Sequence, residues 1–293
     1  MPKKPRTDRL QPELFNAKMD KPQESFRRPT NNFAEGPWKP LLSQKPHATV
    51  PLEQSLGTVV DENQNEQYDR LSYLPLTLVS ARSLGAQSLS ERQEALKRAK
   101  KRQRQKAVSR RETNGRFRYK HPYEFEILNL KYPEFVYQTR DPIPYTPMES
   151  TAAVWVDTLE GVKLMLTELK KAQEIAIDLE HHDRRTYHGL LSLMQISTRN
   201  QDWVIDTLKP WRHELEILNE VFADPRIVKV FHGAFMDIVW LQRDLGLYVV
   251  GMFDTFHACE ALEFPQKSLA YLLKSYVNFD ADKKYQLADW RIR

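Results

Sequence analysis

The sequence predicts an α/β fold in the C-terminal half of the chain: a mixed sheet of about five strands with flanking helices, preceded by a long extended N-terminal strap. Three observations lead to this prediction. Five short stretches between residues 153 and 233 have the apolar patterns of strands. Stretches with a helical period separate and follow them. Before residue 151, prolines and charges interrupt any sustained period.

Charge is distributed unevenly along the chain. Residues 151–293 contain 17 Lys and Arg against 21 Asp and Glu, which leaves 27 and 18 for the first 150 residues. A basic N-terminal half favours a polyanionic partner such as nucleic acid. The single Cys259 excludes an intrachain disulfide and a cysteine zinc site, and it fits a reducing compartment. No apolar run has membrane-spanning length and no signal core is present, so we expect an intracellular protein with no membrane contact and no disulfide-linked partner.

Residues 1–83 are rich in Pro, Asn, Gln and charge, and we expect them to be extended or disordered in isolation. They nevertheless carry scattered large apolar side chains: Phe15, Phe26, Phe33, Trp38, Leu41 and Leu42. Such a segment is either a strap that lies across a folded surface or a plain linker, and composition does not decide between them.

Residues 84–120 form a basic helical or disordered insertion in this interpretation. From Lys97 to Arg111 there are nine Lys or Arg and no acid. The run is a nuclear address, a phosphate-binding arm or a solvated charged insertion. Residues 121–151 resume the strap, with four prolines between residues 132 and 148, and lead into the folded domain.

The folded domain covers residues 152–293. Residues 153–158 predict a short strand, and Asp157 or Thr158 can cap a helix running to about Lys171. The apolar stripe of that helix is Val162, Met165, Leu166 and Leu169. Three further strands, joined by short connections, predict an antiparallel meander over residues 175–183, 190–198 and 202–207.

The rest of the domain is predicted to be mainly helical. A helix over about 212–223 stops at Asp224-Pro225, and the strand 226–233 returns after it, so we expect this strand to run parallel to one of the earlier three. Helices are then predicted over 233–246, near 254–263, near 267–277 and near 285–290.

The strand IAIDLEHHD carries two carboxylates on one face. Asp178 and Glu180 alternate with Ile177 and Leu179, so both acids point away from the apolar face. Like charges at the end of a buried strand repel each other, and oxygen-preferring cations such as Mg²⁺ or Mn²⁺ would relieve that repulsion. Taken alone, an Asp-x-Glu pair is more often a solvated strand end.

Asp237 is the third candidate acid, in the first turns of the helix that follows the strand 226–233. If this strand neighbours the one bearing Asp178 and Glu180, Asp237 would converge on them, with Gly233 as the hinge. Three convergent acids suit two divalent ions about 3.5–4 Å apart that clamp a phosphodiester. The alternative for Asp237 alone is a helix-start acid stabilised by the helix dipole.

Four segments resemble the RNase D-like 3′→5′ exonucleases of the DEDD superfamily: IAIDLEHHD, LMQISTR, VFHGAFMDIVWLQRDLGLYVVGMFDT and KKYQLADWRIR. Within that family they are similar to the fungal exoribonuclease associated with the nuclear RNA exosome. The resemblance covers about residues 115–293. It implies a ribonuclease H-like fold, two divalent metal ions (Mg²⁺ or Mn²⁺), and release of nucleoside 5′-monophosphates from RNA 3′ ends. It also implies exosome subunits as partners and a location in the nucleus, including the nucleolus.

The same resemblance assigns roles residue by residue. Asp178 and Glu180 match the first exonuclease motif and Asp237 the second, which makes these three the catalytic and metal-binding residues. The likeness also implies a terminal-nucleotide pocket lined by His181, Phe231, His232 and Trp240. Trp240 lies three residues after Asp237 on the same helix face; it either packs against sugar or base, or is a core tryptophan.

Other polar residues are given structural roles. His181 and His182 are rejected as metal ligands because hard cations prefer oxygen. Asp206 and Asp254 are interpreted as caps at the ends of strands or loops.

The sequence also departs from the family pattern. The third motif, a Tyr and an Asp one helical turn apart, is expected soon after DWRIR, beyond Arg293. Tyr276 and Asp280 have the spacing but precede this landmark, so we interpret them as a helix-end tyrosine and a loop aspartate. No counterpart of the family's N-terminal cofactor-binding domain or C-terminal HRDC domain is found. We therefore expect a C-terminally incomplete exonuclease domain from a longer protein.

Two functions remain from the sequence. The first is a 3′→5′ exoribonuclease that processes and degrades nuclear RNA. The second is a catalytically incomplete RNA-binding or scaffold fragment of that enzyme. A DNA exonuclease of the same superfamily is a weaker third possibility, distinguished by recognition of the 2′-OH.

Overall fold

The computed structural model describes residues 22–27, 39–56, 58–59, 118–145, 147, 150–183, 188–281 and 288–293. The basic run 97–111 and three of the expected docking residues, Phe15, Phe33 and Trp38, lie outside these ranges. In the part of the chain that is described, no helix is long and apolar enough to cross a membrane.

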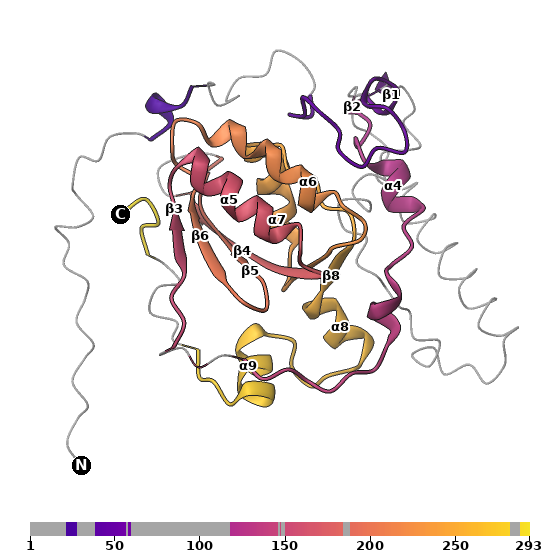
Figure 1. The fold of residues 1–293 in the computed structure, drawn as a ribbon, viewed down its shortest axis with the longest axis vertical. Helices are drawn as coiled ribbons and strands as arrows, with labels where there is room; N and C mark the ends of the chain where they lie inside the picture. Colours follow the sequence, from indigo (N-terminus) through magenta and orange to yellow (C-terminus); the bar gives the residue numbers. More distant parts are fainter. Residues whose placement is uncertain are drawn as a thin grey trace, which may run out of the picture.

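The centre of the fold is a six-stranded mixed sheet with the order β3-β6-β5-β4-β7-β8 (Figure 1). The strands are β3 (Val154–Val156), β4 (Glu174–His182), β5 (Leu190–Ser197), β6 (Asp202–Asp206), β7 (Val228–Phe231) and β8 (Met252–Asp254). The predicted mixed α/β architecture is confirmed. The count of five was one too low, because β8 has only three residues and shows no alternation that the sequence could reveal.

The strand directions also follow the prediction. β4, β5 and β6 pair antiparallel in succession, which is the expected meander. β7 pairs parallel to β4, and β8 pairs parallel to β7. At the other edge β3 runs parallel to β6. The expected neighbourhood of β7 and β4 is the pairing on which the candidate site depends.

Helices flank this sheet. The α-helices are α1 (Leu52–Ser55), α4 (Glu124–Leu128), α5 (Leu159–Leu169), α6 (Asn219–Phe222), α7 (Phe235–Trp240), α8 (Thr255–Ala261) and α9 (Leu269–Val277). Three 3₁₀ segments are η2 (Pro22–Ser25), η3 (Glu134–Tyr137) and η5 (Arg212–Leu218), and a π-helix, η6, covers Leu241–Leu245. Strands β1 (Thr58–Val59) and β2 (Arg118–Tyr119) form a separate antiparallel pair.

Some helix predictions need correction. The helix expected over 212–223 is a 3₁₀ turn followed by the short α6, and the one over 233–246 changes from α to π before it ends at Gly246. The helix expected near 285–290 is wrong for its described part, since residues 288–293 contain only a turn; residues 282–287 lie outside the described ranges.

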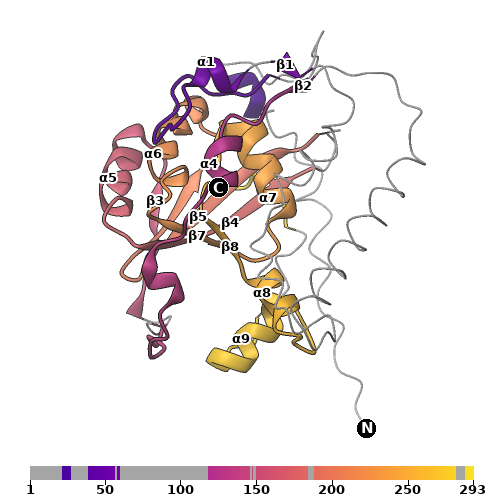
Figure 2. The same cartoon turned by 90° about the vertical axis from the view of Figure 1, so that its right-hand side faces the viewer.

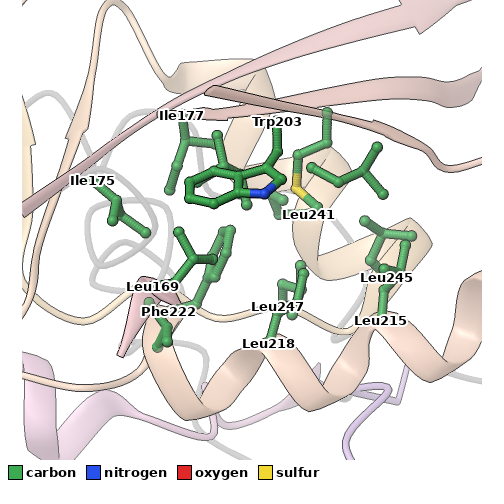
Figure 3. Packing of buried hydrophobic residues seen from close by; sticks show 14 of the residues in the cluster. Leu169, Ile175, Ile177, Trp203, Leu215, Leu218, Phe222, Leu241, Leu245 and Leu247 are labelled. Atoms are coloured by element: carbon green, nitrogen blue, oxygen red, sulfur yellow. The ribbon is translucent and has the colours of Figure 1, made fainter. Parts of the chain in front are cut away.

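The hydrophobic core lies between one face of the sheet and the helices that cross it. Figure 3 shows Ile175, Ile177 and Trp203 pointing from the strands toward leucines of η5 and η6 and toward Phe222. The predicted stripe of α5 is buried in the same cluster, and Thr158 caps that helix by accepting a hydrogen bond from Gly161 N. Because Ile175, Ile177 and Leu179 of β4 face this core, Asp178 and Glu180, which alternate with them, face the other way.

The described parts of the N-terminal segment lie on the folded domain. Phe26 covers the Arg212 guanidinium at 4.7 Å, and Arg27 N donates to Pro210 O. Further along, the buried Lys45 Nζ lies 2.8 Å from Glu126 Oε1. In both views α1 and the β1–β2 pair lie at one end of the molecule, and α8 and α9 lie at the other (Figures 1 and 2).

Candidate active site

Asp178 and Glu180 share the face of β4 that points away from the core. Ile177 and Leu179, which alternate with them, are buried in the main hydrophobic cluster. Asp178 is exposed and Glu180 is half-buried. This is the arrangement expected from the period of two along the strand, so both carboxylates lie on one open face of the sheet.

Asp237 reaches the same region from a different part of the chain. Val230 of β7 pairs with Ala176 of β4, so the end of β7 comes beside the stretch of β4 that leads to Asp178. Helix α7 starts four residues after β7 and carries Asp237 in its first turn. Gly233, at φ +71°, makes the sharp change of direction between them, and a Cβ built on it meets nothing within 4 Å. The turn is therefore open on its outer side.

The negative charges of Asp178 and Asp237 raise the pKa values of neighbouring acids in this group. Burial is the main cause that raises the pKa of Glu180 to about 7, followed by the charges of Asp178 and Asp237. Burial and then the Asp178 charge raise the pKa of Asp237 to about 7. The pKa of Asp178 is raised as well, chiefly by surrounding protein atoms, although its surface remains accessible to water. The sequence predicts that these three acids converge, and the charge interactions of Glu180 with Asp178 and Asp237 are consistent with that prediction.

These residues fit a hard divalent cation. All the donors are carboxylate oxygens, and within the described ranges none of the three forms an ion pair with a cationic side chain. Their raised pKa values indicate negative charge without a counter-charge. The same ranges contain no group of three or more His, Cys, Asp or Glu already arranged to hold a metal ion. The charges of these acids affect one another's pKa values, but the carboxylates are not close enough together to form a complete metal site in this structure.

His181 and Trp240 form an aromatic pair beside the acids. Their rings are parallel, with 1° between the planes and 4.1 Å between the centroids. A β-bulge between Glu180 and His181 shifts the register of β4 against β5 at this point, and bulges commonly redirect a side chain next to a functional site. Trp240 also packs against the main core, which is one of the two roles that the sequence left open.

Two residues that sequence reasoning missed hold the His181 ring in place. Arg243 Nη2 lies 3.3 Å from His181 Nε2, and Arg243 Nη1 donates to His188 O. A Cβ on Gly189 would lie only 2.0 Å from His181 Cε1, so the ring is packed directly against the glycine backbone. Arg243 is 62 positions from His181 and lies in the π-helix η6, whereas Gly189 lies eight positions after His181, just before β5.

Phe231 and His232 differ in their access to the site. Phe231 is 3% exposed and belongs to the main core, so its side chain offers little surface to a ligand. His232 is half-buried, and its Nδ1 lies 2.9 Å from Thr255 Oγ1. Its nearness to Asp178 shows in the charge interaction between them.

The two predicted caps have different outcomes. Asp254 caps α8 by accepting a hydrogen bond from Phe256 N, as expected. Asp206 does not cap a helix, because the next one begins only at Arg212; instead it accepts hydrogen bonds from Leu208 N and from Arg293 Nη2.

Tyr276 and Asp280 interact away from the three acids. Tyr276 is exposed and stacks on Phe264, with the ring centroids 6.2 Å apart. Asp280 pairs with Lys274 at 2.7 Å. Both sets of contacts agree with their interpretation as a helix-end tyrosine and a loop aspartate.

Comparison with known proteins adds independent information. Residues 153–293 match the family described as 3′-5′ exonuclease. The chain is 45% identical over 276 residues to the exosome complex exonuclease RRP6 of Saccharomyces cerevisiae. It is 39% identical over 281 residues to exosome complex component 10 of Homo sapiens. These alignments cover 94% and 96% of this chain but only 31% and 29% of the two relatives, so the chain spans about a third of their length.

A solved structure supports the same assignment. The catalytic core of RRP6 from Trypanosoma brucei superposes with a TM-score of 0.57 at 40% identity, covering 61% of this chain and 50% of that one. The residues matched by the family, 153–293, contain the six-stranded sheet and the three acids described above. Residues 153–293 therefore belong to the 3′-5′ exonuclease family.

Proposed function

We propose that this chain carries the nuclease domain of a 3′→5′ exoribonuclease, a hydrolase that releases nucleoside 5′-monophosphates from RNA 3′ ends. The observation that supports the proposal is that Asp178 and Glu180 lie on the open side of β4, where the charges of Asp178 and Asp237 both help to raise the pKa of Glu180. Kinship with RRP6 proteins supports the choice of RNA as substrate.

Two divalent ions, Mg²⁺ or Mn²⁺, would be held by these three carboxylates. When bound, such ions supply Lewis-acid activation of water and neutralisation of charge at the phosphodiester. The residues themselves provide the oxygen ligands and fix their spacing, because Asp178 and Glu180 are held by one strand and Asp237 by a helix next to it. Removal of the ions is expected to stop hydrolysis without unfolding the sheet.

The stacked His181 and Trp240 rings are proposed to support the terminal nucleotide, together with His232. A rigid aromatic pair can contact a base or sugar with little loss of side-chain freedom. Phe231, a buried core residue next to His232 in the chain, would support the pocket without contacting the nucleotide.

The larger assembly is also a proposal. The relatives are described as exosome components, which supports association of this protein with exosome subunits and action on RNA in the nucleus, including the nucleolus.

The test compares Asp178→Asn with Glu168→Gln; Glu168 is a surface acid of α5 that forms an exposed ion pair with Lys171. With 5′-labelled RNA and Mn²⁺, we expect stepwise shortening by the unaltered chain and by the Glu168 variant. We expect at least about 100-fold slower shortening for Asp178→Asn, since even outer partners of a metal site can cost that much. RNA binding should persist in both variants. Equal turnover in all three proteins would remove Asp178 from the mechanism.

A second candidate is an RNA-binding module that does not turn over. It is favoured by one observation: Tyr276 and Asp280 form other contacts and so do not complement the three acids. RNA binding by residues 1–293 with no monophosphate release at saturating Mn²⁺ would support it. A parallel assay with DNA of the same sequence tests whether the 2′-OH is required.

A further inference from the structure

Asp254 makes more contacts than a helix cap requires. It lies at the end of β8, in register with Phe231 at the end of β7. Its Oδ1 accepts hydrogen bonds from Gly233 N at 2.8 Å and from Phe256 N at 2.8 Å, and its Oδ2 accepts one from Ala234 N at 2.9 Å. Asp254 is 5% exposed. Two of its three bonds therefore go to the turn before α7, not to α8.

The neighbouring Thr255 completes the hold on this turn. Its hydroxyl donates to Phe231 O at 3.0 Å and lies 2.9 Å from His232 Nδ1. All four residues from 231 to 234 are thus bonded to Asp254 or Thr255. No other residue of the described chain is shown bonded to two successive amides of this turn.

The turn has few hydrogen bonds of its own: within it, Phe235 N donates to Gly233 O at 2.8 Å. Gly233 has a left-handed backbone at φ +71°, and the outer side of the turn is open. Helix α7 has only six residues, and Ala234, its N-cap, makes no side-chain cap. Asp237 lies in the first turn of this short helix, so a small tilt at residues 233–234 moves its carboxylate relative to β4.

Asp254 is distinct from the three candidate ligands. Both of its oxygens accept backbone hydrogen bonds from residues outside β8, whereas the backbone hydrogen bonds that lower the pKa values of Asp178 and Asp237 are local, from Leu179 and from Asp237 itself. A buried carboxylate that accepts three backbone hydrogen bonds has a structural role, because those donors stabilise it in place of water. Of the four acids in this region, three are available to a ligand and one holds the backbone.

We propose that Asp254 is a positioning residue: by binding the amides of Gly233 and Ala234 it fixes α7 so that Asp237 faces Asp178 and Glu180. The expected effect on metal binding rests on the proposed metal-dependent function. The hold of Asp254 on the turn rests on the hydrogen bonds alone.

The experiment compares four forms of the 293-residue chain: unaltered, Asp254→Ala, Asp254→Asn and Thr158→Ala. Thr158 is the matched control, because it caps α5 with one side-chain bond to Gly161 N and has no shown contact with the site. Asp254→Asn keeps an oxygen at Oδ1 but cannot accept from Ala234 N through its amide group. It also provides a folded variant if Asp254→Ala does not fold.

Two quantities are measured. The first is hydrogen exchange of peptides covering residues 231–238, with peptides from α8 and α5 as internal references. We expect exchange at 231–238 to become about tenfold faster in Asp254→Ala, less so in Asp254→Asn, and not at all in Thr158→Ala. The second is Mn²⁺ affinity by titration calorimetry, which we expect to fall about 10- to 100-fold in Asp254→Ala and to stay unchanged in Thr158→Ala.

The outcomes distinguish a failure of the positioning role of Asp254 from a failure of the proposed metal-dependent function. Faster exchange confined to α8 would overturn the inference, because Asp254 would then be only the cap of that helix. Faster exchange at 231–238 with unchanged Mn²⁺ affinity would overturn it too, since the turn would not control the ligands. Absence of Mn²⁺ binding by the unaltered chain, with the exchange effect present, would contradict the proposed function while supporting the hold of Asp254 on α7.

Discussion

At the scale of single residues, the site depends on side chains that could be predicted and on neighbours that could not. Asp178 and Glu180 could be predicted because the alternation of β4 fixes which face they occupy. Asp237 could be predicted because its helix follows directly from a strand. Arg243 and Gly189 could not, since their contacts with His181 depend on a bulge and a π-turn that leave no periodic signal.

Gly189 provides a sharp test at this scale. Ala at this position would put a Cβ 2.0 Å from His181 Cε1 and 2.9 Å from His182 O, in addition to the strain of φ +62°. We expect Gly189→Ala to displace His181 from Trp240 and to weaken nucleoside monophosphate binding about tenfold, measured by calorimetry.

The matched control for that substitution is Gly251→Ala. Gly251 has φ +78°, but its Cβ neighbours would be 3.5 Å away or more, so only backbone strain is introduced. Both variants should lose some thermal stability. Equal nucleotide affinity in the two would show that the aromatic pair does not contribute to binding.

At the scale of elements, strands were predicted more reliably than helix types. The meander and the parallel return of β7 follow from connection lengths and apolar alternation. The three residues of β8 escape prediction because their strand character comes from pairing with β7. The apolar spacing of residues 212–223 is compatible with 3.0 or 3.6 residues per turn, so the 3₁₀ geometry of η5 could not be predicted.

Strand β7 contains an unusual buried residue, Lys229. Its Nζ donates to Asp224 O and Ile227 O, and burial lowers its pKa to about 7. Between pH 7 and its ordinary value of 10.5, the unfolded chain binds a proton at this lysine that the folded chain does not. The free energy of unfolding contributed by Lys229 must therefore rise with pH across that window.

Lys229→Met isolates this effect. Urea unfolding at pH 7.5 and 9.5 should show that the unaltered chain gains up to about 2 kcal/mol relative to the variant over these two pH units. The constant difference caused by lost hydrogen bonds cancels in this comparison. Parallel pH dependences in the two proteins would contradict a depressed Lys229 pKa.

At the scale of the whole molecule, the sheet is covered by helices on the core face, and the N-terminal segment lies over parts of that helical layer. Ser43 and Gln44 donate to Glu216 of η5, and His47 lies 2.9 Å from Glu220 O. Phe26, one of the aromatics that suggested docking, covers a buried arginine. The surface that the segment follows could not be predicted, because it is assembled from residues at least 76 positions away.

The Lys45–Glu126 pair should dominate the attachment of residues 39–56. The two side chains are only 2% and 7% exposed, and Glu126 also accepts from Thr49 N and Val50 N. We expect Glu126→Ala to lower the free energy of unfolding by about 3–5 kcal/mol, because it leaves the buried Lys45 ammonium with neutral acceptors, Val50 O and Ser55 Oγ, and no counter-charge. Limited proteolysis should then cut within residues 39–56 first.

Asp280→Asn is the control for that substitution. It removes an ion pair with Lys274 whose side chains are 53% and 80% exposed, which should change stability by less than about 1 kcal/mol. If the two substitutions were equally mild, the buried pair would not secure the segment.

The central claim is that Asp178, Glu180 and Asp237 share divalent cations, and anomalous diffraction from crystals grown with Mn²⁺ tests it most directly. We predict an anomalous peak about 2.0–2.3 Å from carboxylate oxygens of both Asp178 and Asp237, with Glu180 contributing to the same site. A manganese ion bound by Asp178 without Asp237, or by Asp237 without Asp178, would contradict this claim. So would a manganese ion bound elsewhere, with these carboxylates too far apart to share it.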